Sequence, residues 1–110
     1  MPKNQLKQRV KLTQLKAELF RALSNPVRIR ILDELRIEEL TVSEIKDRLE
    51  LELPNISQQL SVLKANNLVC SRKQGVNIYY SCVDTRLFKL LDVAKEIFQA
   101  QLSDLQKTLK

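Results

Sequence analysis

Apolar residues recur three or four positions apart over the first part of the chain, from about residue 5 to residue 23. They are Leu12, Leu15, Leu19, Phe20 and Leu23. This spacing predicts one face of an amphipathic helix. Proline disfavours helical geometry in the residue before it and fits the first turn of a new helix, so Pro26 is expected to open a second one. Its buried face would comprise Val27, Ile31, Leu32 and Leu35.

Two further short helices are expected in close succession. In Thr41-Val42-Ser43-Glu44, the hydroxyl of Thr41 and the carboxylate of Glu44 can satisfy backbone donors at a helix start, which predicts a third helix from about 42 to 50. The fourth helical pattern turns Ile56, Leu60 and Leu63 inward. Two short helices joined by a tight connection predict a helix-turn-helix over residues 41–66.

The composition changes after the fourth helix. Asn67 stands where that helix must end, and asparagine is the best substitute for glycine in a left-handed helix terminus. Residues 68–73 and 77–83 are rich in β-branched and aromatic side chains and flank Gly75, the only glycine. This pattern predicts a β-hairpin over residues 68–83, in the position of a wing.

From Asp84 onward the apolar spacing becomes helical again, which predicts one long helix over 84–110. Its apolar positions are Leu87, Leu91, Ala94, Phe98, Leu102, Leu105 and Leu109. The expected order is ααααββα. The expected fold is therefore mainly α with a small β-hairpin, a single winged helix-turn-helix domain over 1–110.

The first and last helices, residues 12–23 and 84–110, are expected to form a homodimer. A monomer of 110 residues would struggle to bury the apolar faces of both. The alternative is that both helices pack on the core of their own chain.

The length of the chain limits the number of domains, and its net charge indicates the kind of binding partner. The chain of 110 residues has room for one domain, and its net charge of +6 suits a polyanionic partner. The chain has no stretch of 18 apolar residues, and its basic N-terminal segment is not followed by an apolar stretch long enough for a signal peptide. A cytoplasmic protein without a membrane partner is therefore expected.

A helix-turn-helix followed by a basic hairpin can place its second helix in the major groove of double-stranded DNA and its hairpin along the backbone. No acidic residue occurs between Pro54 and Ser81, so the basic side chains of this span are expected to be unopposed. Gln59 has the alternative role of positioning the helix. The predicted DNA contacts are Asn55, Ser57, Gln58, Gln59, Ser61 and Lys64 on the helix and Arg72, Lys73, Gln74 and Asn77 in the wing.

The chain resembles the ArsR/SmtB family of arsenic- and metal-responsive repressors over nearly its whole length. The matching segments are Lys16 to Leu32, Thr41 to Ile45, Ile56 to Lys64, Leu68-Val69, Arg72 to Gly75, and Ile78-Tyr79-Tyr80. The resemblance implies a homodimer built from the first and last helices, an inverted-repeat operator, and a repressor released by an inducer. The inducer is unknown. Asn67 departs from the family pattern, where glycine is common.

The metal ligands of that family are missing from the sequence. Members that respond to metals use Cys-Val-Cys in the third helix or carboxylate and histidine ligands in the last one, whereas this chain has Thr41-Val42-Ser43 and no histidine. Hydroxyls are poor partners for soft metal ions. The last helix offers only isolated carboxylates, namely Asp84, Asp92, Glu96 and Asp104. No metal site and no cofactor are expected.

Cys70 and Cys82 stand on the two sides of the wing, so they could lie opposite or diagonal to one another. Directly opposed residues of a non-hydrogen-bonded pair are within disulfide range, which raises the hypothesis of a redox switch that distorts the wing. The alternative is two inert thiols. The absence of closely flanking basic residues favours that alternative.

Three other classes of function differ from a specific DNA-binding regulator in the residues that they require. An enzyme would want histidine, an activated nucleophile or a glycine-rich phosphate loop, and none is present, so the chain is not expected to be an enzyme. An architectural DNA binder would carry a more strongly basic surface. A winged helix used for protein interaction without specific DNA binding stays open as the alternative function.

Overall fold

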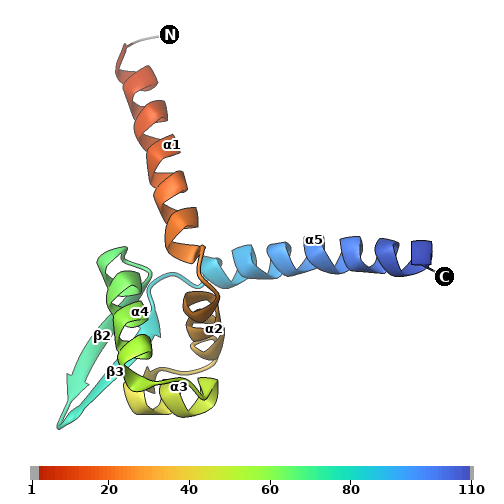
Figure 1. Ribbon diagram of the computed structural model, residues 1–110. Helices are drawn as coiled ribbons and strands as arrows, with labels where there is room; N and C mark the ends of the chain where they lie inside the picture. The colour runs from red at the N-terminus through yellow and green to blue at the C-terminus, as the bar shows by residue number, and fades with distance from the viewer. Residues whose placement is uncertain (1–2, 110) are drawn as a thin grey trace.

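A computed structural model of the chain describes residues 3–109, so residues 1–2 and 110 of the expected 1–110 domain lie outside the described residues. Figure 1 shows a compact body from which the first and last helices project in different directions. The elements are α1 (Lys3–Leu23), α2 (Pro26–Glu34), β1 (Leu40–Thr41), α3 (Val42–Leu49), α4 (Leu53–Ala65), β2 (Val69–Gln74), β3 (Asn77–Cys82) and α5 (Arg86–Leu109). This is the predicted winged helix-turn-helix, with one additional strand.

α2 opens at Pro26, as predicted, and its start is fixed by the residue before it. The Asn25 side chain accepts hydrogen bonds from the backbone N–H groups of Val27 at 2.9 Å and Arg28 at 3.1 Å. Asparagine is a preferred N-cap because its short side chain satisfies donors that have no partner inside the helix. Sequence reasoning assigned the break to proline alone and missed this cap.

The predicted capping box opens α3. The Thr41 hydroxyl accepts from the backbone N–H of Glu44 at 3.2 Å, and the Thr41 backbone N–H donates to Glu44 Oε1 at 3.1 Å. At its other end α3 stops at Glu50, whose φ of 55° is left-handed. The chain then enters α4 with Pro54 in the first turn. This short connection keeps α3 and α4, the two helices of the helix-turn-helix, next to each other.

The wing, formed by β2 and β3, pairs antiparallel from Val69↔Cys82 to Gln74↔Asn77. A two-residue turn joins the strands, and only its first residue, Gly75, has a positive φ, as in a type II′ turn. Asn67 has a φ of 59°, which confirms the predicted left-handed end of α4.

The sheet has three strands, whereas the sequence predicted two. β1 pairs antiparallel with β3 through Leu40↔Tyr80 and Thr41↔Tyr79, which gives the strand order β1-β3-β2. A strand of two residues has no periodicity that a sequence pattern can reveal. Its effect is structural, because it fastens the segment before α3 to the wing.

The core lies between α2, α3, α4 and the inner face of the sheet. Its largest fully buried side chains are Ile31, Leu32, Leu40, Ile45, Ile56, Leu60, Leu63 and Val69. The inward positions predicted for the fourth helix, Ile56, Leu60 and Leu63, are buried. Of those predicted for the second helix, Ile31, Leu32 and Leu35 are buried, whereas Val27 is only partly buried against the core. Truncating a buried leucine or isoleucine to alanine typically destabilises a protein by about 2–5 kcal/mol, so these residues fix how α4 sits on the body.

The two projecting helices, α1 and α5, are called the terminal arms below. The radius of gyration of 17.5 Å exceeds the roughly 13 Å of a compact domain of this length because the arms extend beyond the body. Their exposed apolar residues are Leu6, Val10, Leu12, Leu15 and Phe20 on α1 and Val93, Ile97, Phe98, Leu102 and Leu105 on α5. No helix among residues 3–109 is both long enough and apolar enough to span a membrane.

Candidate nucleic-acid interface

The predicted contact residues of α4 fall into two groups. Ser57, Gln58, Ser61 and Lys64 are exposed on the side of the helix away from the core. Asn55 and Gln59 are half-buried and contact each other. The outer surface of α4 therefore carries hydroxyl, amide and ammonium groups, the side chains that bind base edges and phosphates in a major groove.

Gln59 is held from both sides. Its Oε1 accepts a hydrogen bond from Arg28 Nη1 of α2 at 2.9 Å, and its Nε2 donates to Asn55 Oδ1 at 3.3 Å. Both polar ends of this half-buried side chain are therefore occupied by other residues of the chain. These contacts favour the alternative role of Gln59, positioning of the helix, and Arg28 is a functional candidate that sequence reasoning missed.

Lys64 connects the recognition helix to the wing. Its ammonium group donates to the hydroxyl of Ser71 on β2 at 2.8 Å. Ser71 and Lys73 share one face of β2 with the buried Val69, because alternate residues of a strand point to the same side. Lys64, Ser71 and Lys73 consequently place two positive charges along the junction of α4 with the wing.

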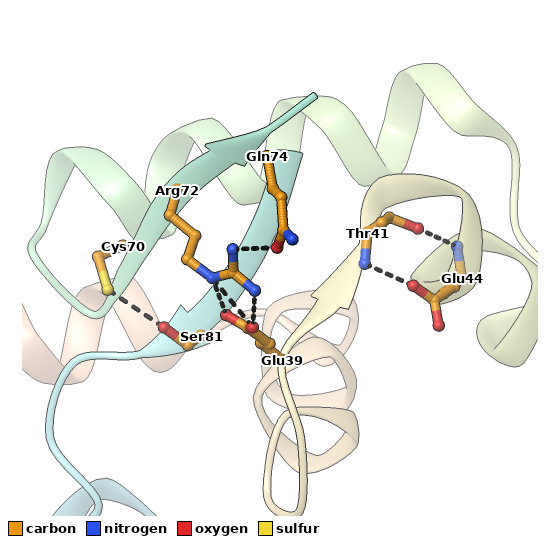
Figure 2. A network of polar contacts seen from close by, with 7 residues as sticks. All are labelled: Glu39, Thr41, Glu44, Cys70, Arg72, Gln74 and Ser81. Carbon is orange, nitrogen blue, oxygen red and sulfur yellow. Dashed lines mark hydrogen bonds and ion pairs between the residues drawn. The ribbon is translucent and has the colours of Figure 1, made fainter. Parts of the chain in front are cut away.

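Arg72 is not unopposed, which corrects the expectation drawn from the sequence. It forms a two-pronged ion pair with Glu39, with Arg72 Nε 2.8 Å from Oε2 and 3.0 Å from Oε1 (Figure 2). Arg72 also donates to Gln74 Oε1 at 2.6 Å, and its guanidinium lies over the ring of Tyr79, 4.7 Å from the centroid. The hydrogen bonds raise the pKa of Arg72 and lower that of Glu39.

The reason for this correction lies in the extra strand. β1 lies beside β3, and this brings the residue before β1 next to the wing, although Glu39 and Arg72 are 33 positions apart. The absence of acid between Pro54 and Ser81 therefore did not describe the neighbours of the wing. Arg72 and Gln74 share the face of β2 that points away from the core, whereas Lys73 lies on the opposite face.

The cysteines do not face each other, so the opposite or diagonal placement of Cys70 and Cys82 that the sequence allowed is wrong. Cys70 is opposite Ser81, whose hydroxyl lies 3.2 Å from its sulfur, and Cys82 is opposite Val69. Because neighbouring residues of a strand point to opposite faces, the two thiols lie on opposite faces of the sheet. Both are free. No disulfide within the hairpin fits this register.

The two thiols also differ in their surroundings. Cys70 is exposed, whereas Cys82 is half-buried against the core and donates a hydrogen bond to the backbone oxygen of Asp84 at 3.2 Å. Burial raises the pKa of the Cys82 thiol. Since the thiolate is the reactive form, Cys82 is the less reactive of the two.

Two carboxylates considered as ligand candidates form ion pairs at the base of α5. Asp92 lies 2.9 Å from Arg36 Nη2. Asp84 accepts from the backbone N–H of Arg86 at 2.9 Å and from its guanidinium at 2.6 Å, which lowers the pKa of Asp84 to about 2. In the part of the chain that the structure describes, no three histidine, cysteine or carboxylate side chains gather closely enough to hold a metal ion.

Comparison with known proteins agrees with this arrangement. A family model for a helix-turn-helix domain matches residues 23–72. The chain is 39% identical over 94 residues to an HTH-type transcriptional regulator of Mycobacterium tuberculosis, Rv0081. This match covers 84% of this chain and 82% of that protein. The crystal structure of Rv0081 matches with a TM-score of 0.75 over 84% of this chain and 94% of that one.

Two further relatives extend the comparison. A transcriptional repressor SmtB homolog of Synechocystis is 35% identical over 74 residues, 67% of this chain and 56% of that protein. A homodimeric winged helix-turn-helix DNA-binding domain of Mycobacterium bovis, from a possible ArsR-family regulator, matches with a TM-score of 0.75 at 30% identity. The match covers 86% of this chain and 90% of that one.

Proposed function

Because the chain belongs to the ArsR/SmtB family of helix-turn-helix transcriptional regulators, we propose that it is a homodimeric repressor that binds an inverted-repeat DNA operator. The observation that carries the proposal is the outer surface of α4. It presents Ser57, Gln58 and Ser61, with Lys64 at the junction to the wing, and no acidic residue lies between Pro54 and Ser81. A helix that is only solvated usually carries glutamate and lysine on that surface.

The terminal arms support the homodimer. Phe20 and Phe98 are 56% and 62% exposed, and each belongs to an apolar row on its arm. Near its base α5 borders a hollow of about 640 Å³ shared with α2, whose apolar lining includes Ile29, Leu91 and Phe98. A second copy is the occupant we assign to this surface, because the row is too long to leave in water and the related M. bovis domain is homodimeric.

Within the interface, Gln58 is the direct base contact of this proposal, and Lys64 and Lys73 contact phosphates. Asn55 lies near the start of α4, the part of a recognition helix that reaches base edges. Ser57, Ser61, Gln74 and Asn77 complete the predicted contact set. Gln59 positions the helix, and Arg72 contributes less charge than its position suggests because Glu39 neutralises it.

The signal that would release the repressor from its operator is separate from DNA binding, and the two cysteines are the first residues to consider for it. The register of the wing leaves no direct bridge between Cys70 and Cys82, so a redox response of this protein would act through the exposed Cys70 alone. The inducer that the family resemblance implies has no assigned site among these residues.

The test is binding of the purified protein to the DNA immediately upstream of its own gene, with scrambled DNA of the same length as competitor. A specific regulator should bind the true fragment roughly 10³-fold or more tightly than the scrambled one at physiological salt. Equal binding to both fragments would contradict specific recognition. Failure to bind either one would favour the protein-interaction alternative.

The dimer is tested in the same preparation by sedimentation equilibrium. Phe98→Glu places a charge in the apolar row of α5, and should shift the mass toward the monomer and weaken operator binding. Ala100→Glu adds the same charge two positions on, about 200° around the helix, and should leave the dimer intact. A monomeric wild type would contradict the proposal, as would a Phe98→Glu variant that remains fully dimeric.

A further inference from the structure

Arg28, Gln59 and Asn55 form a continuous hydrogen-bonded relay from the end of α1 to the start of α4. Arg28 Nε donates to the backbone oxygen of Ala22 at 2.5 Å, and Nη2 donates to that of Arg21 at 3.3 Å. Arg28 Nη1 donates to Gln59 Oε1 at 2.9 Å, and Gln59 Nε2 donates to Asn55 Oδ1 at 3.3 Å. All three side chains of the relay are half-buried.

Arg28, the first residue of the relay, is held in place by the C-terminal end of α1. The carbonyl groups of Arg21 and Ala22 belong to the last turn of α1, where helix carbonyls have no partner inside the helix. The guanidinium supplies a partner for the Ala22 oxygen and a second one for the Arg21 oxygen, which already accepts from the backbone N–H of Ser24 at 3.1 Å. A positive charge there is also favoured by the negative end of the helix dipole. The backbone of Arg28 is itself held by the Asn25 cap. The direction in which Nη1 reaches toward α4 is thereby fixed.

The polarity of the relay follows from this anchor. A guanidinium has five N–H donors and no acceptor, so Gln59 must turn its oxygen toward Arg28 and its NH₂ group toward Asn55. Asn55 must then offer Oδ1 to Gln59, which turns its own NH₂ group away from the relay. The orientation of both amides, normally ambiguous between oxygen and nitrogen, is set by one charged group.

We infer that Arg28, acting through Gln59, is a positioning residue that makes Asn55 present hydrogen-bond donors to DNA, so that this position of the interface selects an acceptor atom. An asparagine side chain that is free to flip could pair with either a donor or an acceptor on the DNA. Locked in this way, Asn55 is complementary to a phosphate oxygen or to an acceptor of the major groove, and it disfavours the amino groups of adenine and cytosine. The inference rests on the proposed operator binding and assigns the chemistry of one contact in it.

Gln59→Glu tests the polarity with little change of shape. The carboxylate still accepts from Arg28, but it can no longer donate to Asn55, whose amide must turn to donate inward and expose its oxygen to DNA. Operator affinity should fall by a factor of roughly ten to a hundred, the range of one good polar contact. The added negative charge also weakens binding, so the variant alone does not isolate the amide.

A double-mutant cycle separates the two effects. Asn55→Ala removes the amide, and in that background Gln59→Glu retains only the effect of its charge, so the two losses should be strongly non-additive. The matched control cycle combines Gln59→Glu with Gln58→Ala, a neighbour outside the relay, and should be nearly additive. Additive losses in the Asn55 cycle would overturn the inference.

Chemically modified DNA shows whether a phosphate or a base supplies the acceptor that Asn55 contacts. Single methylphosphonates, which remove one phosphate charge, and base analogues that each lack one major-groove acceptor are scanned through the operator. At one position the change should weaken wild type but not Asn55→Ala, and the kind of change that does so identifies a phosphate or a base. No such position in either scan would overturn the inference. A wild type that does not prefer its operator would overturn only the proposed function.

Discussion

Glu39 and Arg72 form an ion pair across 33 positions of the chain, with Arg72 Nε 2.8 Å from Glu39 Oε2. It joins the residue that precedes β1 to the middle of β2 (Figure 2). In the proposed DNA complex, Arg72 would contact a phosphate less strongly because its charge is balanced by a carboxylate from outside the interface. The pair would then lower non-specific attraction to DNA without removing a basic residue from the wing.

Glu39→Gln should therefore raise, not lower, affinity for scrambled DNA. With Arg72 free to contact a phosphate, the slope of log affinity against log salt concentration should steepen by about 0.9. Glu38→Gln is the matched control, because Glu38 pairs at 2.6 Å with Arg48 of α3 rather than with the wing. An unchanged or weakened affinity of Glu39→Gln would show that the pair supports the wing instead of masking it.

Gln58→Ala should weaken binding to the operator by roughly 1–3 kcal/mol, the range for loss of a good bidentate base contact. Gln58 is exposed on α4, so the substitution should leave the stability of the fold nearly unchanged. Fluorescence anisotropy with operator and scrambled DNA measures the effect. The same loss on both DNAs would contradict a base contact.

Thr41→Ala should destabilise the protein by about 1 kcal/mol, because it removes the hydroxyl that caps α3. Urea unfolding of the free protein measures this change. Ser43→Ala removes a hydroxyl two residues later, in the same first turn, that takes no part in the capping box, and it should have little effect. Equal midpoints for the wild type and Thr41→Ala would argue that the capping box contributes nothing.

Asp84 should make stability fall in strong acid. Its pKa is lowered from 3.8 to about 2, first by the side-chain hydrogen bond from Arg86 and then by the backbone one. A group with a depressed folded-state pKa contributes stability above its unfolded value, and this contribution is lost as pH falls through the folded one. The stability difference between wild type and Asp84→Asn should therefore shrink between pH 4 and pH 2. A carboxyl of Asp84 that titrates near 3.8 by NMR would contradict this.

Cys70 should react with iodoacetamide faster than Cys82, because Cys70 is exposed while burial raises the pKa of Cys82. Mass spectrometry of the native protein treated with a mild oxidant should find no bridge between the two cysteines within one chain. The Cys70→Ser, Cys82→Ser double variant should bind the operator as wild type does, with and without oxidant. An oxidant effect on the wild type that the double variant lacks would restore the thiol switch.

Local chemistry made much of the fold predictable. The spacing of Ile56, Leu60 and Leu63, the pairing of Thr41 with Glu44, and the left-handed Asn67 are determined by residues close in sequence, and the structure has all of them. The hairpin was also predictable, because its strands flank the only glycine of the chain.

Tertiary neighbours account for what the sequence could not predict. The Glu39–Arg72 pair depends on a two-residue strand, and the contact of Arg28 with Gln59 spans 31 positions. The cysteines illustrate the sensitivity of strand pairing, because a change of one residue in register moves a side chain to the other face of the sheet. Composition located the basic segment but did not identify its partners.

Thr41 belongs to two elements at once, since it pairs with Tyr79 as the last residue of β1 and caps the first turn of α3. There is consequently no hinge between the sheet and the helix-turn-helix, and Lys64 closes the other side of the same unit through Ser71. The wing and the helix-turn-helix therefore form one preassembled unit. In the proposed dimer, adjustment to the separation of two half-sites would fall to the points where α1 and α5 leave this unit.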